Sequence, residues 1–359
     1  MKNQSITEAM LQFIEESPTA FHAAANVEAL LLENGFEKLE NLAEGALVPG
    51  GSYYTMQNGS AVLAVKIPEN PAKGFRIAAS HSDSPCFKIK EVPEMKVENT
   101  YVKLNVEKYG GMILSPWLDR PLSVAGRVFV AGKDEKPEAK LVNLKKDLLI
   151  IPNVAIHFNR EINNGFAYNP QTDMAPLMGL DQELSIKKLC AEAAGVAEEE
   201  ILGSDLYVYN RDKGRIMGAD DSLIGSPRLD DLQCAYATLR GFLASKPEEF
   251  ISVYALFDNE EVGSGTKQGA DSTFLEEFLE IVLENVYPDK NRLWKRSFYQ
   301  NSFLLSADNG HAVHPNHPEK TDPTNRPYLN GGIVIKYHGS QKYTTDGISA
   351  ARMKDYCER

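Results

Sequence analysis

The sequence has few cysteines, no long apolar run and no excess of basic residues. Its four cysteines lie far apart in a chain of 359 residues, which excludes a cysteine-rich zinc module and disfavours a disulfide framework. Residues 1–15 lack the apolar stretch behind a basic patch that a secretory signal has. No apolar run approaches the roughly 20 residues of a membrane-spanning helix. These features predict a cytoplasmic protein with reduced cysteines.

The formal net charge of −12 disfavours two classes of partner. A nucleic-acid-binding protein concentrates Lys and Arg on one face, and an anionic membrane surface attracts the same residues. The hydrophobic fraction of 43% is that of an ordinary globular protein. A chain of this length has room for one large α/β domain and a smaller one.

The N-terminal part has helix and hairpin signals. Ser5 is a candidate N-cap for a first helix, and Asn34-Gly35 ends a second helix predicted from residue 20. Asn58-Gly59 predicts a two-residue hairpin turn, and the apolar run 75–80 predicts a short buried strand.

A β-rich segment then interrupts the α/β pattern. Val102, Leu104 and Val106 alternate with polar residues, as half-buried strands do. The α/β pattern returns with a helix from about Asp230. The further elements predicted are a helix at 186–193, a strand at 206–209, a strand at 251–257, a helix at 274–283, and strands at 302–306 and 332–337. We therefore predict a catalytic α/β domain in two parts, 1–92 and 218–359, with a β-rich domain inserted at 93–217.

Acidic residues and histidines follow three of the predicted strands. They are His81 and Asp83 after the first, Asp258, Glu260 and Glu261 after the second, and Asp308 and His311 after the third. In open α/β sheets the functional crevice lies at the carboxyl ends of the strands, so these clusters can converge. The pair Asp230-Asp231, at a helix start, can reach the same crevice.

Each cluster also has a simpler explanation. An Asp at a helix start is ordinarily an N-cap, and adjacent acids such as Glu260 and Glu261 are ordinarily solvated. However, acids directly after a buried strand need a partner, a proton or a cation, because burying a bare carboxylate is costly. Three repetitions of this arrangement favour a metal site.

The donor types indicate the metal and the reaction. One imidazole with several carboxylates and no thiolate suits zinc, manganese or cobalt. Two metals that share a carboxylate would suit amide hydrolysis, since they activate a water and polarise the carbonyl. Of the adjacent Glu260 and Glu261, one can act as general base while the other binds metal.

Several motifs resemble the aspartyl aminopeptidase (M18) family, in order and over nearly the whole chain. They are HSDSP at 81–85, WLDRPLSVAGR at 117–127, AIHFNR at 155–160, RLDD at 228–231, DNEEVGS at 258–264 and SADNGHAVHPN at 306–316. The resemblance implies that His81 and Asp308 bind one metal and that Asp230 bridges to a second. It implies further that Glu261 binds the second metal and that Glu260 is the general base.

Other residues have supporting roles in this interpretation. Asp83 is expected to orient His81, since metal-bound imidazoles usually donate their other N–H. By the resemblance, His157 reaches the active site of a neighbouring subunit, and His311, Lys336 and Tyr343 line the substrate pocket. Lys336 could instead be the solvated end of a strand, and Tyr343 a core or interface aromatic.

The family implies a zinc-peptidase-like mixed sheet flanked by helices, an inserted β-rich dimerisation domain and a twelve-subunit assembly. It implies a metal-dependent aminopeptidase with two divalent ions per subunit that removes N-terminal Asp or Glu from peptides. Its members continue beyond Arg359 with a final His ligand of the second metal. The alternatives are a deacylase or carboxypeptidase on a similar scaffold, and a silent or truncated relative that acts only in assembly or binding.

Overall fold

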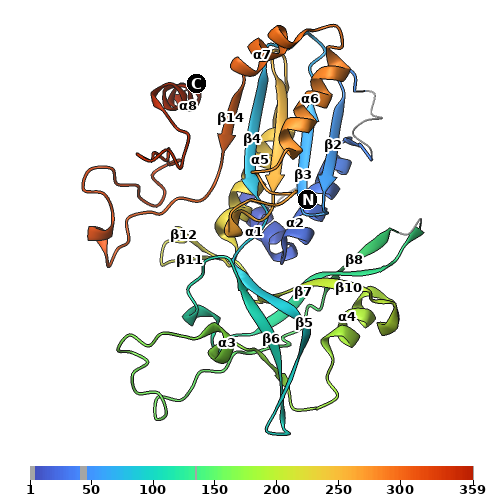
Figure 1. The fold of residues 1–359 in the computed structure, drawn as a ribbon. Helices are drawn as coiled ribbons and strands as arrows, with labels where there is room; N and C mark the ends of the chain where they lie inside the picture. The colour runs from blue at the N-terminus through green and yellow to red at the C-terminus, as the bar shows by residue number, and fades with distance from the viewer. Residues whose placement is uncertain (1–4, 41–46, 134–135, 359) are drawn as a thin grey trace. The chain divides into compact units, whose positions relative to one another are not determined.

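The computed structural model describes residues 5–40, 47–133 and 136–358 (Figure 1). The chain divides into two compact units, Met1–Ala307 and Asp308–Arg359, and each is considered by itself. No helix of the described ranges is both long enough and apolar enough to cross a membrane.

A mixed six-stranded sheet forms the centre of the first unit, in the order β1-β2-β3-β13-β4-β14. The central strand β13 runs parallel to β4 and antiparallel to β3, and β14 runs parallel to β4. The strands are β1 Glu37–Lys38, β2 Ser52–Gln57, β3 Ala61–Lys66, β4 Phe75–His81, β13 Ile251–Phe257 and β14 Phe303–Ser306. Because β4 and β13 are parallel neighbours, His81 and Phe257 end at the same edge of the sheet.

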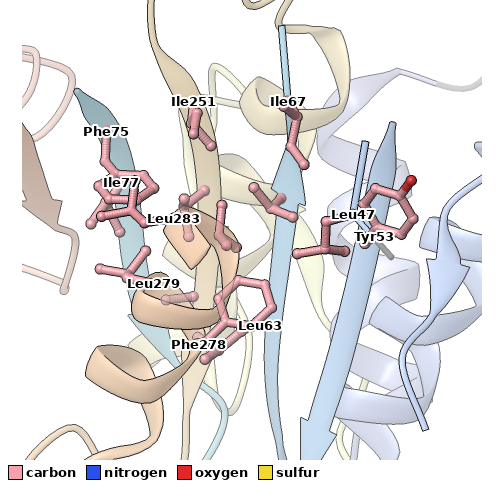
Figure 2. Packing of buried hydrophobic residues seen from close by; sticks show 14 of the residues in the cluster. Leu47, Tyr53, Leu63, Ile67, Phe75, Ile77, Ile251, Phe278, Leu279 and Leu283 are labelled. Atoms are coloured by element: carbon pink, nitrogen blue, oxygen red, sulfur yellow. The ribbon is translucent and has the colours of Figure 1, made fainter. Parts of the chain in front are cut away.

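Helices cover both faces of this sheet, because its central strands are apolar on both sides. On β13, Val253 and Ala255 pack with α6 (Phe274–Val286) and α7 (Arg292–Gln300), as Figure 2 shows for Phe278, Leu279 and Leu283 of α6. The alternate residues Tyr254 and Leu256 pack with α1, α2 and α5. These helices are α1 Ile6–Glu16, α2 Ala20–Glu33 and α5 Leu229–Ala244. The predicted mixed sheet flanked by helices is confirmed.

A second six-stranded sheet lies between β4 and α5 in the sequence. Its strands pair antiparallel, in the order β8-β7-β10-β5-β6-β9. Its strands are β5 Cys86–Val97, β6 Tyr101–Tyr109, β7 Leu122–Ala131, β8 Pro137–Asn143, β9 Leu177–Gly179 and β10 Gly203–Asn210. Helices α3 (Pro170–Asp173) and α4 (Ile186–Ala194) and the hairpin β11 (Arg215–Met217) and β12 (Leu223–Gly225) belong to the same stretch. The domain limits at 93 and 217 stay a prediction.

The predicted N-terminal helices are confirmed at their caps. Ser5 and Glu8 form a reciprocal capping box, and Asn34 is the C-cap of α2. The hairpin turn differs from the prediction. Pairing begins at Gln57 with Ala61, so that the turn has three residues, of which Asn58 and Gly59 have positive φ.

The second unit contains one helix, α8 (Gly347–Glu358), and a 3-10 turn, η5 (Pro318–Lys320), within its described residues. The predicted buried strand at 332–337 was wrong. These residues have no regular structure, and Ile333 and Val334 are exposed. A strand needs a neighbour for its N–H and C=O groups, and the described part of this unit contains no strand to pair with it.

Candidate metal centre

The imidazole of His81 lies at the carboxyl end of β4 and is buried, with 4% of the residue exposed. Its backbone N–H donates to Asp231 Oδ2 at 3.1 Å, and its Nδ1 lies 3.1 Å from Asp83 O and 3.2 Å from Asp83 Oδ1. The other ring nitrogen, Nε2, has no hydrogen-bond partner among the described residues. It lies 3.4 Å from Asp230 Oδ1 and 3.9 Å from Glu260 Oε2. An imidazole held at Nδ1, with a bare Nε2 facing carboxylates, has the arrangement of a metal ligand.

Asp83 connects three parts of the first unit. Besides its contact with His81, its Oδ1 accepts the N–H of Glu260 at 3.2 Å, and its Oδ2 accepts the N–H of Glu261 at 3.2 Å. The hydroxyl of Tyr109, the last residue of β6, donates to Oδ2 at 2.7 Å. The carboxylate therefore orients the imidazole and holds the turn after β13.

The acidic pair at the start of α5 is not in helical conformation. Asp230 has φ −82° and ψ 110°, and Ser84 Oγ donates to its carbonyl at 2.7 Å. The Asp230 side chain is 56% exposed, whereas Asp231 is fully buried. The N-cap of α5 is Arg228, so Asp230 does not serve as an ordinary helix cap.

The turn after β13 carries Glu260 and Glu261. It begins with Asn259 at φ 63°, and Asn259 Oδ1 accepts hydrogen bonds from Thr266 at 2.8 Å and Gln268 at 2.7 Å. Glu260 is half exposed, as a base that must meet a substrate would be. Glu261 lies against Gly110, which follows β6.

The concentration of carboxylates changes the proton affinities of the site. Burial raises the pKa of Glu261 to about 7, the charges of Asp230 and Asp83 add to this rise, and His81 opposes it. Burial and the charge of Asp83 raise the pKa of Asp258 to about 6. Burial alone lowers the pKa of His81, but the neighbouring carboxylates of Asp230, Asp83 and Asp231 raise it to about 11. Carboxylates that repel one another and retain protons form a site suited to a cation.

The residues fit a divalent metal ion. His81, Asp230 and Asp231 each offer a ligand atom, and these atoms lie within 4.8 Å of one another. The donors are one nitrogen and several oxygens without a thiolate, which suits zinc, manganese or cobalt. The buried, unbonded Nε2 of His81 supplies the open donor that such an ion needs.

A cavity of about 490 Å³ adjoins these acids. Asp83, Asp230, Asp258 and Glu261 line one part of it, and apolar and aromatic residues line another: Phe21, Pro116, Trp117, Tyr109 and Tyr207. A partly apolar cavity with convergent polar groups is the usual form of a ligand site.

The remaining expected residues lie elsewhere in the chain. His157 is exposed on the irregular segment between β8 and α3, and the residues that line this cavity do not include it. In the second unit, Lys336 Nζ donates to Asp308 Oδ2 at 3.0 Å and to Asn309 O at 2.7 Å. It also lies 5.6 Å from the centroid of the Tyr343 ring, and His311 is exposed.

Two contributors had no role in the expected site, Asp231 and Tyr109. Asp231 had a signal, because it is the second acid of a pair at a helix start. Tyr109 had none, because its bond joins the end of β6 to Asp83, a residue 26 positions away in the loop after β4.

Comparisons with known proteins agree with this chemistry. Residues 13–359 match the family model described as "Aminopeptidase I zinc metalloprotease (M18)". A probable M18 family aminopeptidase 2 of Clostridium acetobutylicum is 44% identical over 366 residues, covering 99% of this chain and 84% of that protein.

Solved structures show the same fold. A chain of the Ape4 and Nbr1 complex has a TM-score of 0.92 at 32% identity and covers 98% of this chain and 72% of its own. A chain of the S. cerevesiae mApe1 dodecamer has a TM-score of 0.87 at 25% identity, covering 99% and 83%. This chain therefore belongs to the M18 family of metal-dependent aminopeptidases.

Proposed function

We propose that this aminopeptidase binds two divalent metal ions, zinc by preference, and releases N-terminal Asp or Glu from peptides. The observation that carries the proposal is the buried Nε2 of His81, which faces the carboxylates of Asp230 and Glu260 without a hydrogen bond. When the imidazole of His81 gives up its proton, the lone pair of Nε2 faces these carboxylates and is available to a cation.

The proposed ligands divide into two sets. His81 and Asp308 bind the first ion, Asp230 bridges both ions, and Glu261 binds the second. For Asp308 the support is the family resemblance. For His81 and Asp230 it is also their mutual distance of 3.4 Å, and for Glu261 it is the raised pKa that Asp230 and burial cause.

The ions would lower the pKa of a water and polarise the scissile carbonyl. Glu260, half exposed and held through its N–H by Asp83, accepts the proton of the attacking water and passes it to the leaving amine. Asp83 keeps the imidazole of His81 in one orientation throughout, because it contacts Nδ1 at 3.2 Å.

The proposed binding of the acidic N-terminal residue of the substrate involves residues of the second unit. The ammonium of Lys336 is half-buried and already contacts a carboxylate, that of Asp308. Among the residues that the structure describes, the ammonium of Lys336 donates to Asp308 and Asn309, and its third donor is assigned here to a substrate carboxylate. We assign His311 and Tyr343 to the same substrate pocket.

We further propose a homo-oligomer in which residues 93–217 form the dimer contact and His157 reaches the neighbouring active site. Ile150, Val154, Ile156 and Phe158, on or beside the His157 segment, are all exposed, and Phe158 is 86% exposed. Several exposed apolar side chains within nine residues of sequence support a protein contact on this segment. The four cysteines are free, which suits the cytoplasm.

The test is hydrolysis of peptides with N-terminal Asp or Leu by this chain, after chelation and after addition of zinc, manganese or cobalt. We expect metal-dependent release of free Asp, slower release of Leu, and none from an N-acetylated peptide. Equal activity in chelator would contradict the metal mechanism. Faster release of Leu would contradict the acidic preference alone. Release from the acetylated peptide would favour the deacylase alternative.

A further inference from the structure

The last residue of β6, Tyr109, belongs to the second sheet, yet its hydroxyl lies in the hydrogen-bond network of the candidate metal centre. We propose that Tyr109 is a positioning residue for this centre, through which the second sheet fixes the orientation of the metal-binding side chains. The inference rests on the proposed function and names a residue that the family motifs do not include.

The hydroxyl is fixed in direction by two partners. It donates to Asp83 Oδ2 at 2.7 Å and accepts from Asn259 Nδ2 at 2.9 Å. Burial and the charges of Asp83 and Asp258 raise the pKa of Tyr109, so the hydroxyl remains a donor at neutral pH. With its acceptor site engaged by Asn259, the hydroxyl directs its proton to Oδ2 of Asp83 and stabilises that orientation of the carboxylate.

That carboxylate controls two parts of the centre. Its Oδ1 contacts Nδ1 of His81, and its two oxygens accept the N–H groups of Glu260 and Glu261. Without the tyrosine hydroxyl, Oδ2 keeps one described donor, the N–H of Glu261. The carboxylate can then rotate, which turns the imidazole of His81 and loosens the turn that carries the base and a ligand.

The second sheet also holds the ring of Tyr109. The ring packs edge-on against Tyr207 of β10, with 5.7 Å between the ring centroids. This packing does not involve the hydroxyl, so a phenylalanine at position 109 retains it. The substitution Tyr109→Phe therefore separates the role of the hydrogen bonds from that of the ring.

The matched control is Tyr54→Phe. Tyr54 is fully buried in the first sheet, and its hydroxyl donates to a carboxylate, Glu28 Oε1, at 3.0 Å. The Tyr54→Phe variant therefore loses a similar hydrogen bond, at a position outside the metal centre. We measure zinc affinity by chelator competition, the cobalt(II) absorption spectrum, and the melting temperature of the metal-free chain.

We expect Tyr109→Phe to weaken zinc binding by about 10-fold or more. The cobalt spectrum should change, kcat should fall more than KM rises, and Tyr54→Phe should retain the affinity of the parent chain. If Tyr109→Phe does not fold, Asn259→Gly removes the other partner of the hydroxyl while keeping the positive φ. Because it also removes the bond from Gln268 to Asn259 Oδ1, Gln268→Ala is its control, and Asn259→Gly should weaken zinc binding more than this control does.

Equal zinc affinity in Tyr109→Phe and Tyr54→Phe would overturn the inference and leave the proposed function standing. A parent chain that binds no zinc, manganese or cobalt would overturn the proposed metal centre and, with it, the role of Tyr109. The two failures are therefore distinguished by the parent chain.

Discussion

Gly110 lies so close to Glu261 that a β-carbon on the glycine would stand 3.0 Å from the β-carbon of the glutamate. Gly110 also has φ +73°, which disfavours other residues. The end of β6 thus contacts the centre twice, through Tyr109 at Asp83 and through Gly110 at Glu261.

We predict that Gly110→Ala lowers both stability and metal affinity. The backbone conformation alone costs about 1 kcal/mol in free energy of unfolding. The contact with Glu261 adds to this and displaces a proposed ligand. Gly195→Ala is the control, because Gly195 has a similar φ of +67° and no atom within 4 Å of its added β-carbon. Urea unfolding and zinc titration of both variants measure the difference, and identical losses would contradict the contact effect.

We predict that Glu260→Gln reduces kcat by roughly 100-fold or more while zinc remains bound, because an amide cannot accept the proton of the attacking water. Turnover of an N-terminal Asp substrate and metal content by atomic absorption give the two readings. Glu280→Gln, at an exposed position on α6, is the control for loss of one charge. An unchanged rate in Glu260→Gln would assign the base elsewhere.

The proposed action of His157 across an interface can be tested by complementation. His157→Ala and Glu260→Gln should each be inactive alone. When equal amounts are mixed, about half of the dimers contain both variants, and one site in each combines an intact Glu260 with an intact His157 of the neighbour. Activity should therefore return at roughly one quarter of the sites in the whole mixture. The subunits are unfolded and refolded together before assay. No recovery, with mixed assembly shown by mass spectrometry, would contradict the shared site.

The metal-free chain should lose stability as pH rises from about 5 to 9. Glu261 has a raised pKa of about 7 in the folded chain against 4.5 in the unfolded chain, so folding binds protons between these values. His81, raised from 6.5 to about 11, binds protons on folding over the higher range, and its contribution is lost towards pH 11. Deprotonation of either group with rising pH therefore lowers the free energy of unfolding.

Melting temperatures in chelator across this pH range measure the effect. In Glu261→Gln, the melting temperature should change less with pH in the lower part of the range. Zinc should stabilise the chain more at pH 8 than at pH 5, because the ion binds the deprotonated groups. A stability that rises with pH in chelator would contradict the assignment.

Lys336→Met should reduce kcat/KM for an N-terminal Asp substrate relative to a Leu substrate by about 10-fold, as loss of one charge-assisted hydrogen bond does. Because Lys336 also contacts Asp308, the ratio of the two substrates is the informative quantity. Any general damage to the centre cancels in that ratio. Lys342→Met, at an exposed position, is the control. An unchanged ratio would exclude Lys336 from substrate selection.

Local signals in the sequence predicted the local features of the fold. Ser5 and Asn34 cap helices through bonds to neighbouring residues, and the apolar run 251–257 could only be buried. Acids after the strands likewise predicted that His81, Asp83 and Glu260 would meet, because parallel strands end at one edge.

Features that depend on distant partners could not be predicted in this way. The pattern at 332–337 is that of a strand, but a strand exists only where a neighbour accepts its hydrogen bonds. Tyr109 resembles any other aromatic of a β-rich segment until the second sheet brings it to Asp83. The acidic pair at the helix start indicated that Asp231 could reach the crevice, but not that it would hold the backbone of His81, a residue 150 positions away.

The bond from Ser84 to the carbonyl of Asp230 joins residues 146 positions apart, and the whole second sheet is made by the chain between them. Closing so long a loop is slow, because its entropy is lost before any contact of the centre forms. We expect the metal centre to assemble among the last steps of folding. The ion would then bind only to chains whose first unit is already correctly folded.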